Sequence, residues 1–475
     1  MSGAAGRLAL AALRSASEGS VLGIRAANPR GALLPGRAGG EQGNGLRPSF
    51  QLSVVPAQLP PWLSLGGRAR SASTRGGTYA LARTVFGLGA RICQGGVSRR
   101  LTGSRGGGRP PEIRQGQLMQ EIKGCTDAGG LLLLLLLHGQ SFDFIHIGAA
   151  WGSLAGMRGA GARGADGEVI QRLQALTRAK APEMDVRGVS SVLYSMAKMY
   201  QRGRKVADDE LEGELLARAV ATAGDFDPQG VANLLWSLAT MGSTPDPRLL
   251  EAMQGRATAM AGDFTPQGVA NLMWALATMG STPDPRLLEA MQGRATAMAG
   301  DFTPQGVANL LWSLATMGST PDPRLLAAMQ GRATATAGDF TPQGVTNLMW
   351  ALATMGSKAD PLLLAAMQRR ATATTGDFNP QDFANLLWAL ACFDTSPSQV
   401  SGLMVESMAV RLLSVREQLS VEGKTQVHQW LLFCDLHPEW CGKLPRSMQL
   451  VKQELGAAFR QAFVNQPRST SRLQV

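Results

Sequence analysis

A block of 38 residues recurs from Asp225 to Gly376 with almost no change, and this repeat constrains the fold more than any other feature. Its first copy reads DFDPQGVANLLWSLATMGSTPDPRLLEAMQGRATAMAG. Further copies begin at Asp263, Asp301, Asp339 and Asp377. A fixed period of this size is typical of stacked supersecondary units that bury their apolar faces against one another. We therefore expect function along an extended surface and not in an enclosed pocket.

Each unit carries the start and stop signals of two helices. Thr265–Pro266 is a helix cap followed by proline at the first helical position, where its missing N–H costs nothing. Gly242 predicts the end of the first helix, Asp246–Pro247 the start of the second, and Gly262 its end. The sequence thus predicts an all-α fold, a right-handed α-solenoid of 38-residue helix hairpins with a disordered N-terminal leader.

Composition and periodicity divide the chain into four parts. These are a basic leader with a transit peptide (1–114), an N-terminal helical cap (115–183), helical repeats (184–391) and a C-terminal helical region (392–475). The repeats comprise a diverged copy (184–224), four near-identical copies (225–376) and a partial copy (377–391). The diverged copy is recognised because MDVRGVSSVLYSMAKM aligns with FDPQGVANLLWSLATM of the first copy.

The net charge of +11 belongs to the leader. Residues 1–114 hold 16 arginines and three glutamates, a net of +13, whereas the rest of the chain holds 30 basic and 32 acidic residues, a net of −2. The overall basicity is therefore no evidence that the repeats bind a polyanion. A leader rich in Arg, Ala, Gly and Ser and poor in acids is typical of an organellar transit peptide, and the alternative is a basic tail that stays on the protein.

Neither a membrane span nor a cofactor is expected. The seven leucines from Leu131 to Leu137 fall short of the about 20 apolar residues that cross a bilayer, so they predict a buried helix. Cys434, His437 and Cys441 have an unusual spacing for a metal site, and the five cysteines of the chain are scattered. No nucleophile motif, phosphate loop or paired-carboxylate signature is found, so the sequence predicts a protein that is not an enzyme and uses no small-molecule substrate.

A helical wheel places an uncharged polar stripe opposite the apolar face of the first helix of each unit. In the first copy this stripe contains Gln229, Asn233, Ser237 and Thr240, with Trp236 at its border. The same stripe recurs as Gln267, Asn271, Thr278, Gln305, Asn309, Thr316, Gln343, Asn347, Thr354, Gln381 and Asn385. A ladder of such groups suits base edges and backbone oxygens of single-stranded RNA. The alternative is that these side chains are solvated or join one unit to the next.

Tryptophans and arginines also recur once per unit. The tryptophans could stack on bases, but a Trp beside an apolar stripe favours the core between helices. They are Trp236, Trp274, Trp312, Trp350 and Trp388. The arginines of the second helix could contact phosphates, although acids accompany them and a solvated surface is the alternative. They are Arg256, Arg294, Arg332 and Arg370, with Arg248, Arg286 and Arg324 at the start of that helix.

The period, the PQ that opens the first helix and its LLWSLA or LMWALA core resemble the octotricopeptide repeat of green algae. HGQSFDFIHIGAAWGSL and KTQVHQWLLF resemble helical regions of the related FAST-kinase-like proteins that carry a C-terminal RAP domain. The resemblance covers about Gln117 to Val475. It implies a nucleus-encoded protein that is imported into a chloroplast or mitochondrion and binds organellar RNA. The RAP domain itself is not recognised before Val475, so it is absent or the sequence is truncated.

The near identity of the units limits what they can distinguish. If each first helix reads one nucleotide, the main variation is Ser237 and Ser313 against Ala275, Ala351 and Ala389. Specificity would then come from the diverged units at 184–224 and 386–465. The leading interpretation is an organellar RNA-binding protein that acts on transcript stability, processing or translation. The alternative is a helical-repeat scaffold for other proteins in an organelle, which the neutral charge of the repeats favours.

Overall fold

The computed structural model describes residues 113–157, 163–204, 206, 208–393, 402–436 and 447–464. Every regular element among these residues is a helix. They fall into two compact units that divide between Arg218 and Ala219. Most of the predicted leader, residues 1–112, lies outside the described part of the chain. The all-α class predicted from the repeat is confirmed.

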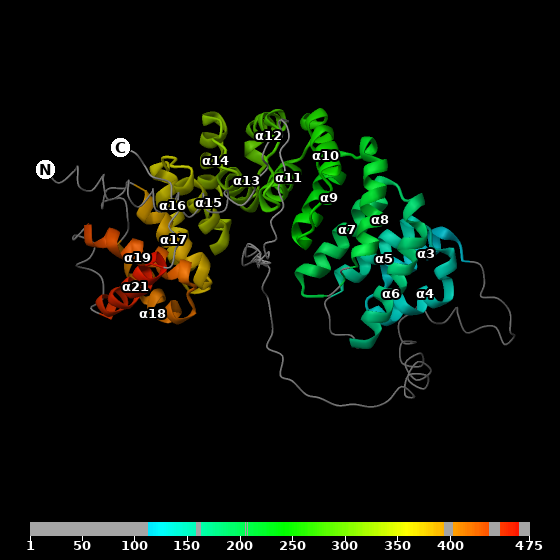
Figure 1. Ribbon diagram of the computed structural model, residues 1–475, viewed down its shortest axis with the longest axis horizontal. Coiled ribbons are helices and arrows are strands. Elements are labelled where there is room, and N and C mark those ends of the chain that lie inside the picture. The colour runs from blue at the N-terminus through cyan, green and yellow to red at the C-terminus, as the bar shows by residue number, and fades with distance from the viewer. Residues whose placement is uncertain are drawn as a thin grey trace, which may run out of the picture. The chain divides into compact units, whose positions relative to one another are not determined.

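The first unit is built from helices that pack in two rows (Figure 1). One row is α3 (Gln115–Gly124), α5 (Phe144–Gly156) and α7 (Val186–Gln201), and each of these helices packs against the next. In the other row, α4 (Ala128–His138) packs against α6 (Arg163–Lys180), and α8 (Asp209–Ala221) follows in the chain. A non-helical segment, Cys125–Asp127, separates α3 from α4. The Asp127 carboxylate caps α4 by accepting from the N–H of Gly130 at 2.9 Å.

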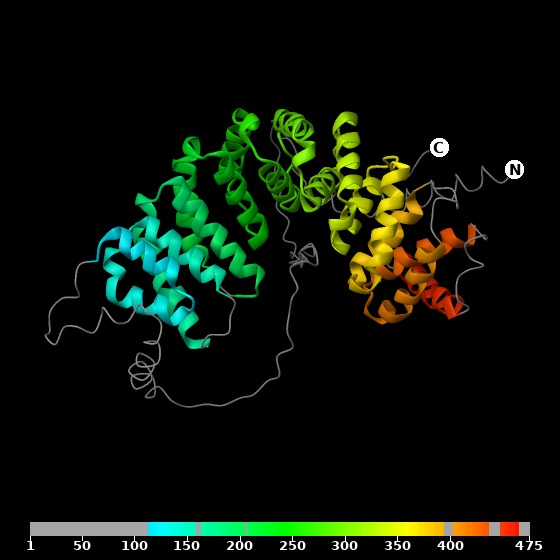
Figure 2. The same cartoon turned by 180° about the vertical axis from the view of Figure 1, so that it is seen from behind.

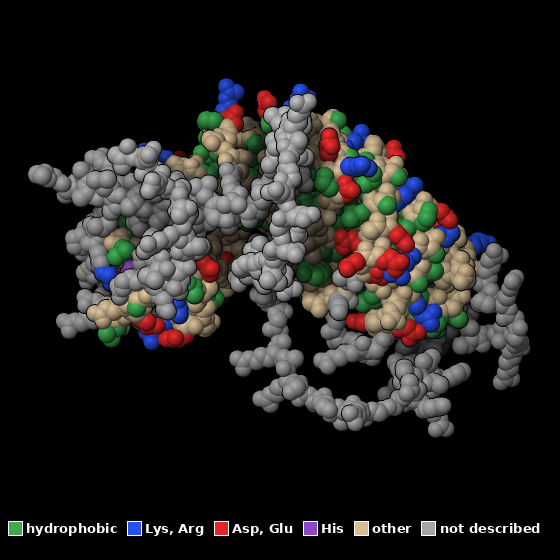
Figure 3. Space-filling view, in the orientation of Figure 1, with side chains coloured by type: hydrophobic (Ala, Val, Ile, Leu, Met, Phe, Trp, Pro, Cys, Tyr) green, Lys and Arg blue, Asp and Glu red, His purple; other side chains and the backbone are tan. Residues whose placement is uncertain are grey.

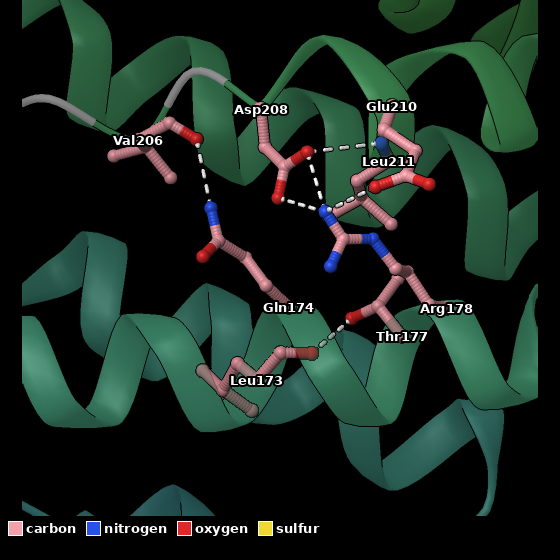
Figure 4. A network of polar contacts seen from close by, with 8 residues as sticks. All are labelled: Leu173, Gln174, Thr177, Arg178, Val206, Asp208, Glu210 and Leu211. Carbon is pink, nitrogen blue, oxygen red and sulfur yellow. Dashed lines mark hydrogen bonds and ion pairs between the residues drawn. The ribbon is translucent and has the colours of Figure 1, made fainter.

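A polar network joins α6 to the segment before α8 (Figure 4). The Arg178 guanidinium donates to both carboxylate oxygens of Asp208, at 2.7 and 2.6 Å. The same carboxylate accepts from the backbone N–H of Leu211 at 3.1 Å, which caps α8. Gln174 donates to the carbonyl of Val206 at 3.3 Å. These contacts fix the entry of the chain into α8.

The second unit contains the repeats, whose helices form two layers (Figures 1 and 2). The first helix of each repeat is here called its A helix and the second its B helix. The A helices are α9 (Pro228–Met241), α11 (Pro266–Thr278), α13 (Pro304–Thr316), α15 (Pro342–Thr354), α17 (Pro380–Cys392) and α19 (Val421–Leu436). The B helices are α10 (Pro247–Ala259), α12 (Pro285–Ala297), α14 (Pro323–Ala335), α16 (Pro361–Ala373) and α18 (Gly402–Val415). Each A helix packs against the next A helix and each B helix against the next B helix, as a solenoid of hairpins requires.

Helix ends follow the sequence signals with one exception. The Thr265 hydroxyl accepts from the N–H of Gly268 at 3.1 Å, which caps α11 as predicted. Gly242 has a φ of +74° and ends α9 in the left-handed conformation. The prediction that Gly262 ends α10 is wrong, because that helix stops at Ala259 and Gly262 lies within a 3-10 turn, Ala261–Asp263. A similar 3-10 turn precedes every A helix from α9 to α19.

The repeat architecture extends on both sides of the near-identical copies. Before α5, buried Phe142 and the capping Asp143 follow a 3-10 turn, as Phe226 and Asp227 do before α9. Before α19, the buried Leu419 and the capping Ser420 follow another 3-10 turn. The Ser420 hydroxyl accepts from the N–H of Gly423 at 3.0 Å. The copy that begins at Asp377 is completed by α18, which packs against α16. Helix α21 (Ser447–Val464) packs against α19 and α18.

The run of leucines in α4 is only partly buried. Leu131, Leu134 and Leu135 are at most 6% exposed, because they face the neighbouring helices. Leu133, Leu136 and Leu137, on the other side of α4, are exposed. The prediction of a buried helix therefore holds for one face. Among the helices that the structure describes, none is both long and apolar enough to cross a membrane.

Candidate functional site

One stripe of each A helix from α9 to α17 is partly left open by its neighbours. Its positions are spaced i, i+4, i+7 and i+11, so they lie on one face of a helix. In α13 these positions are Gln305, Asn309, Trp312 and Thr316, of which Gln305 and Thr316 are exposed and the other two are half-buried. We refer to this stripe, repeated along the A helices, as the open face.

The predicted Gln and Asn candidates line the open face. Every Asn of the row is half-buried. The Gln side chains are exposed in the first three repeats and half-buried at Gln343 and Gln381. Gln381 donates to Asn385 at 3.1 Å and to Gln426 of α19 at 3.4 Å, so at this end the ladder is joined to the next helix. The residues of the two rows are Gln229, Gln267, Gln305, Gln343, Gln381, Asn233, Asn271, Asn309, Asn347 and Asn385.

The serine and threonine positions depart from the prediction. Thr240 is completely buried, Thr278 and Thr354 are half-buried with buried hydroxyl oxygens, and Thr316 is exposed. Ser237 is also completely buried, and its hydroxyl donates to the carbonyl of Asn233 in its own helix at 2.6 Å. Thr240 and Ser237 are therefore not on the accessible surface, whereas Thr316, at the position of Thr240 in α13, is.

The serine–alanine alternation is consequently not part of the accessible surface. Ser313 repeats the bond of Ser237, donating to the carbonyl of Asn309 at 2.6 Å, and it is completely buried. Ala275, Ala351 and Ala389 are buried at the same position. The main variation among the near-identical A helices lies inside the core.

The tryptophans divide between core and surface. Trp274 is 2% and Trp388 9% exposed, as the core interpretation predicts. Trp236, Trp312 and Trp350 are half-buried and contribute to the open face. The rings of Trp236 and Trp274 lie 6.4 Å apart at a tilt of 39°, a geometry that aromatic pairs favour. The i+7 spacing from the Gln could have placed them on the open face from the sequence.

The predicted arginine row has a structural role through its Nε atoms. In each repeat Nε of this arginine donates to the carbonyl of the phenylalanine before the A helix of the same repeat. The distances are 2.8 Å for Arg256 and Phe226, 2.9 Å for Arg294 and Phe264, 2.7 Å for Arg332 and Phe302, and 2.7 Å for Arg370 and Phe340. These carbonyls lie in the bend between a 3-10 turn and an A helix, and the arginine provides their hydrogen bond. Binding of phosphates by this row is not what its geometry favours.

The open face of the near-identical repeats is uncharged. The A helices α9, α11, α13 and α15 contain no Asp, Glu, Lys or Arg. Arg248, Arg286 and Arg324 are exposed, but they begin B helices and so belong to the other layer. On the face drawn in Figure 3, acidic and basic side chains are mixed over the helices from α3 to α10. The open face of the near-identical repeats can form hydrogen bonds and stack on aromatic rings, but it supplies no cation to phosphates.

Among the residues that the structure describes, Cys125 and Asp382 have perturbed pKa values. Burial, together with the charges of Asp127 and Glu121, raises the pKa of the Cys125 thiol to about 11. Burial raises the pKa of the Asp382 carboxyl to about 6, against the opposing effect of a hydrogen bond from Asn379. Within the described ranges no three His, Cys, Asp or Glu residues are grouped as metal ligands would be, while His437 and Cys441 lie outside those ranges.

The repeats are similar to one family of known proteins. Residues 175–398, from within α6 to a point between α17 and α18, match the family model of the RNA-editing substrate-binding complex 6 protein. No curated protein matches the chain. Over its central helical repeats the chain is thus similar to a protein whose name associates it with a complex that binds the RNA substrates of editing.

Proposed function

We propose that the chain is an organellar RNA-binding protein and that single-stranded RNA binds to the open face of the A helices. The observation that carries this proposal is the row of half-buried Asn side chains, one in each repeat, next to half-buried tryptophans at Trp236, Trp312 and Trp350. An asparagine amide both donates and accepts, which suits a base edge. An accessible indole ring provides a surface on which any base stacks.

The similarity to the RNA-editing substrate-binding complex 6 protein supports an association with RNA. It covers the repeats that form the open face, and the name of that protein places it in a complex. By analogy, this chain works together with other proteins on its RNA. The finer resemblance to octotricopeptide repeats supports a role in the stability, processing or translation of a transcript. In this role the chain binds RNA without catalysing a reaction or using a small-molecule substrate.

The composition of the leader supports import into a chloroplast or mitochondrion. Residues 1–114 have a net charge of +13 and few acids, as transit peptides do. Fusing 1–114 to a fluorescent reporter and locating it in an algal cell tests this part of the proposal. A reporter that stays in the cytosol would contradict import into an organelle but would not contradict RNA binding.

RNA binding is tested with a triple variant, Asn271→Ala, Asn309→Ala and Asn347→Ala, in the full chain. Each substitution removes one amide from the open face and leaves the charge unchanged. We expect affinity for a mixed-sequence RNA oligonucleotide to fall at least tenfold, since each lost hydrogen bond contributes about 0.5–1.5 kcal/mol. The matched control is Thr244→Ala, Thr282→Ala and Thr320→Ala, which changes exposed turn residues at the same period. Equal affinity in both triple variants would contradict the proposed face.

A protein scaffold is the second candidate, and the uncharged open face favours it. Phosphates are usually bound by Lys or Arg, and Nε of each arginine in the row from Arg256 to Arg370 bonds to the fold. Crosslinking in cells followed by sequencing of the attached RNA distinguishes the two candidates. An RNA-binding protein yields a defined set of transcripts, whereas a scaffold yields none above background.

A further inference from the structure

The A helix of the diverged copy differs from the others at every position of the open face. Asp185 caps α7 by accepting from the N–H of Gly188 at 2.7 Å, as Asp227 caps α9 by accepting from Gly230 at 2.6 Å. This shared cap aligns the two helices without ambiguity. The positions of Gln229, Asn233, Trp236 and Thr240 in α9 are then occupied by Arg187, Ser191, Tyr194 and Lys198 in α7.

These substitutions turn a neutral stripe into a cationic one with an aromatic ring. Arg187, Ser191 and Lys198 are exposed, and Tyr194 is half-buried. The ammonium of Lys198 lies over the Tyr194 ring, 4.6 Å from its centroid. Thr240, which corresponds to Lys198, is completely buried, so α7 presents a charge where α9 presents no accessible group. The changes in residue type and in exposure both favour contact with an anion.

Three other arginines of this unit donate hydrogen bonds to backbone carbonyls. Arg204 donates to the carbonyls of Leu154 and Met157 at 3.1 and 2.9 Å, at the end of α5. Arg202 donates to the carbonyl of Ala155. Arg218 donates to the carbonyl of Met184 at 2.7 Å, repeating the bond that Arg256 makes in the first near-identical copy. Arg187 and Lys198 are both exposed, on one face of α7.

We propose that the stripe Arg187–Ser191–Tyr194–Lys198 on α7 is an electrostatic anchor for single-stranded RNA. Arg187 and Lys198 bind two separate backbone phosphates, and the Tyr194 ring holds the Lys198 ammonium in place by a cation–π contact. This inference rests on the proposed function, and it concerns α7 alone. The stripe contributes affinity and salt dependence through its two cations, a kind of contact that the uncharged A helices α9, α11, α13 and α15 cannot make.

The test replaces the two cations by the residues of the first near-identical copy. The double variant Arg187→Gln, Lys198→Thr is compared with the wild-type full chain for binding to an oligouridine over a range of salt concentrations. The leader is the same in both proteins, so it does not affect the difference between them. Each phosphate contact contributes about −0.7 to the slope of log K against log salt for a single strand. We expect the slope to become shallower by about 1.4, with a clear loss of affinity at low salt.

The matched control is Arg248→Gln, Arg286→Gln, which removes the same charge from exposed positions of B helices. We expect it to keep the wild-type slope. A charge-preserving variant, Arg187→Lys, Lys198→Arg, should keep it as well. Because the substituted side chains are exposed, all variants should melt at the wild-type temperature. If the double variant melts lower, the single substitution Lys198→Thr takes its place. Its expected change in slope is half as large.

Three outcomes would overturn the anchor. An unchanged slope in Arg187→Gln, Lys198→Thr, together with lost binding in the triple Asn variant, removes the anchor and leaves the proposed function intact. Binding of polyglutamate that is lost in Arg187→Gln, Lys198→Thr and is not displaced by polyuridine would identify an acidic protein segment as the ligand of the stripe. Absence of RNA binding by the wild-type chain removes both proposals.

Discussion

The guanidinium of Arg256 donates from Nε to the carbonyl oxygen of Phe226 at 2.8 Å and so connects the B helix of a repeat to the bend before its A helix. The diverged copies keep a bond between these two positions. Arg218 donates from Nε to the carbonyl of Met184 at 2.7 Å, and Arg411 donates from Nη2 to that of Phe378 at 2.5 Å. Retention in copies that differ at most other positions indicates that this arginine belongs to the fold.

Replacing such an arginine should destabilise the repeats. In Arg332→Gln the carbonyl of Phe302 loses a charged donor, and because Arg332 is half-buried we expect a loss of about 1–2 kcal/mol, near the lower end of values for charged hydrogen bonds. Urea denaturation followed by circular dichroism measures it. Arg324→Gln in the same B helix removes an exposed charge and should leave the midpoint unchanged. Equal midpoints for the two variants would show that the bond contributes nothing.

Two glycines of the third repeat should respond in opposite ways to alanine. Gly331 lies inside α14 with open space around it, so Gly331→Ala should stabilise the protein by about 0.5–1 kcal/mol through higher helix propensity. Gly318 has a φ of +63°, and Gly318→Ala should destabilise it by about 1–2 kcal/mol. Thermal melting of both variants tests the pair. A gain in Gly318→Ala would contradict the assigned end of α13.

Asp382 should make the stability of the fifth repeat depend on pH. Its side chain is buried, 4% exposed, and burial raises its pKa to about 6. An unfolded aspartate has a pKa of about 3.9, so between these values the unfolded chain has released a proton that the folded chain keeps. Stability therefore falls as the pH rises from about 4 to about 6 and stays lower above it. The upper bound on this loss is about 3 kcal/mol.

The variant Asp382→Asn isolates this effect. Asn379 donates to Oδ2 of Asp382 at 2.6 Å, and an asparagine oxygen at that site can accept the same bond. We expect the variant to exceed the wild type in melting temperature at pH 7.5 and to match it at pH 4. Asp339→Asn, at an exposed position, is the control and should show no such difference. Parallel melting curves for wild type and Asp382→Asn at both pH values would exclude a raised pKa.

Trp312 should contribute to RNA binding through its ring. A stacked base contributes about 1–3 kcal/mol, so Trp312→Leu should weaken binding roughly 5- to 150-fold, whereas Trp312→Phe keeps a ring and most of the affinity. Binding to oligouridine by fluorescence anisotropy measures both. Trp274, 2% exposed, provides the comparison: Trp274→Phe should lower the melting temperature and leave the affinity of the folded protein unchanged. Full affinity in Trp312→Leu would assign that ring to the core.

Local signals in the sequence predicted the helices well because each is a backbone effect. Proline at the first helical position, the capping Thr265 and the left-handed Gly242 set helix ends through their own conformation and hydrogen bonds. Gly262 was assigned wrongly because the sequence does not distinguish a glycine that ends a helix from one in a 3-10 turn. The sequence also does not show that α18 is the B helix of the fifth copy, because its residues differ from those of the other B helices. Only the structure shows that Arg411 of α18 bonds to the carbonyl of Phe378.

The candidate site was predicted in part. A helical wheel placed Gln305 and Asn309 correctly on the open face, because their angle on the helix depends only on spacing. It misplaced Thr240 and Ser237, because the width of the exposed stripe depends on how closely the next A helix approaches. It could not recognise the role of Arg332, since the carbonyl it contacts lies 30 residues earlier in the chain.

The sequence by itself determined the period, the helical class and the polar residues available to the open face, because these follow from local backbone preferences and from spacing. Only the tertiary structure decided which of them reach solvent. Trp274 and Trp350 have the same neighbours, LMWALA, yet Trp274 is buried and Trp350 is half-buried. Identical local sequence cannot encode that difference. It arises from the packing of each helix against the next, and burial is a property of that assembly.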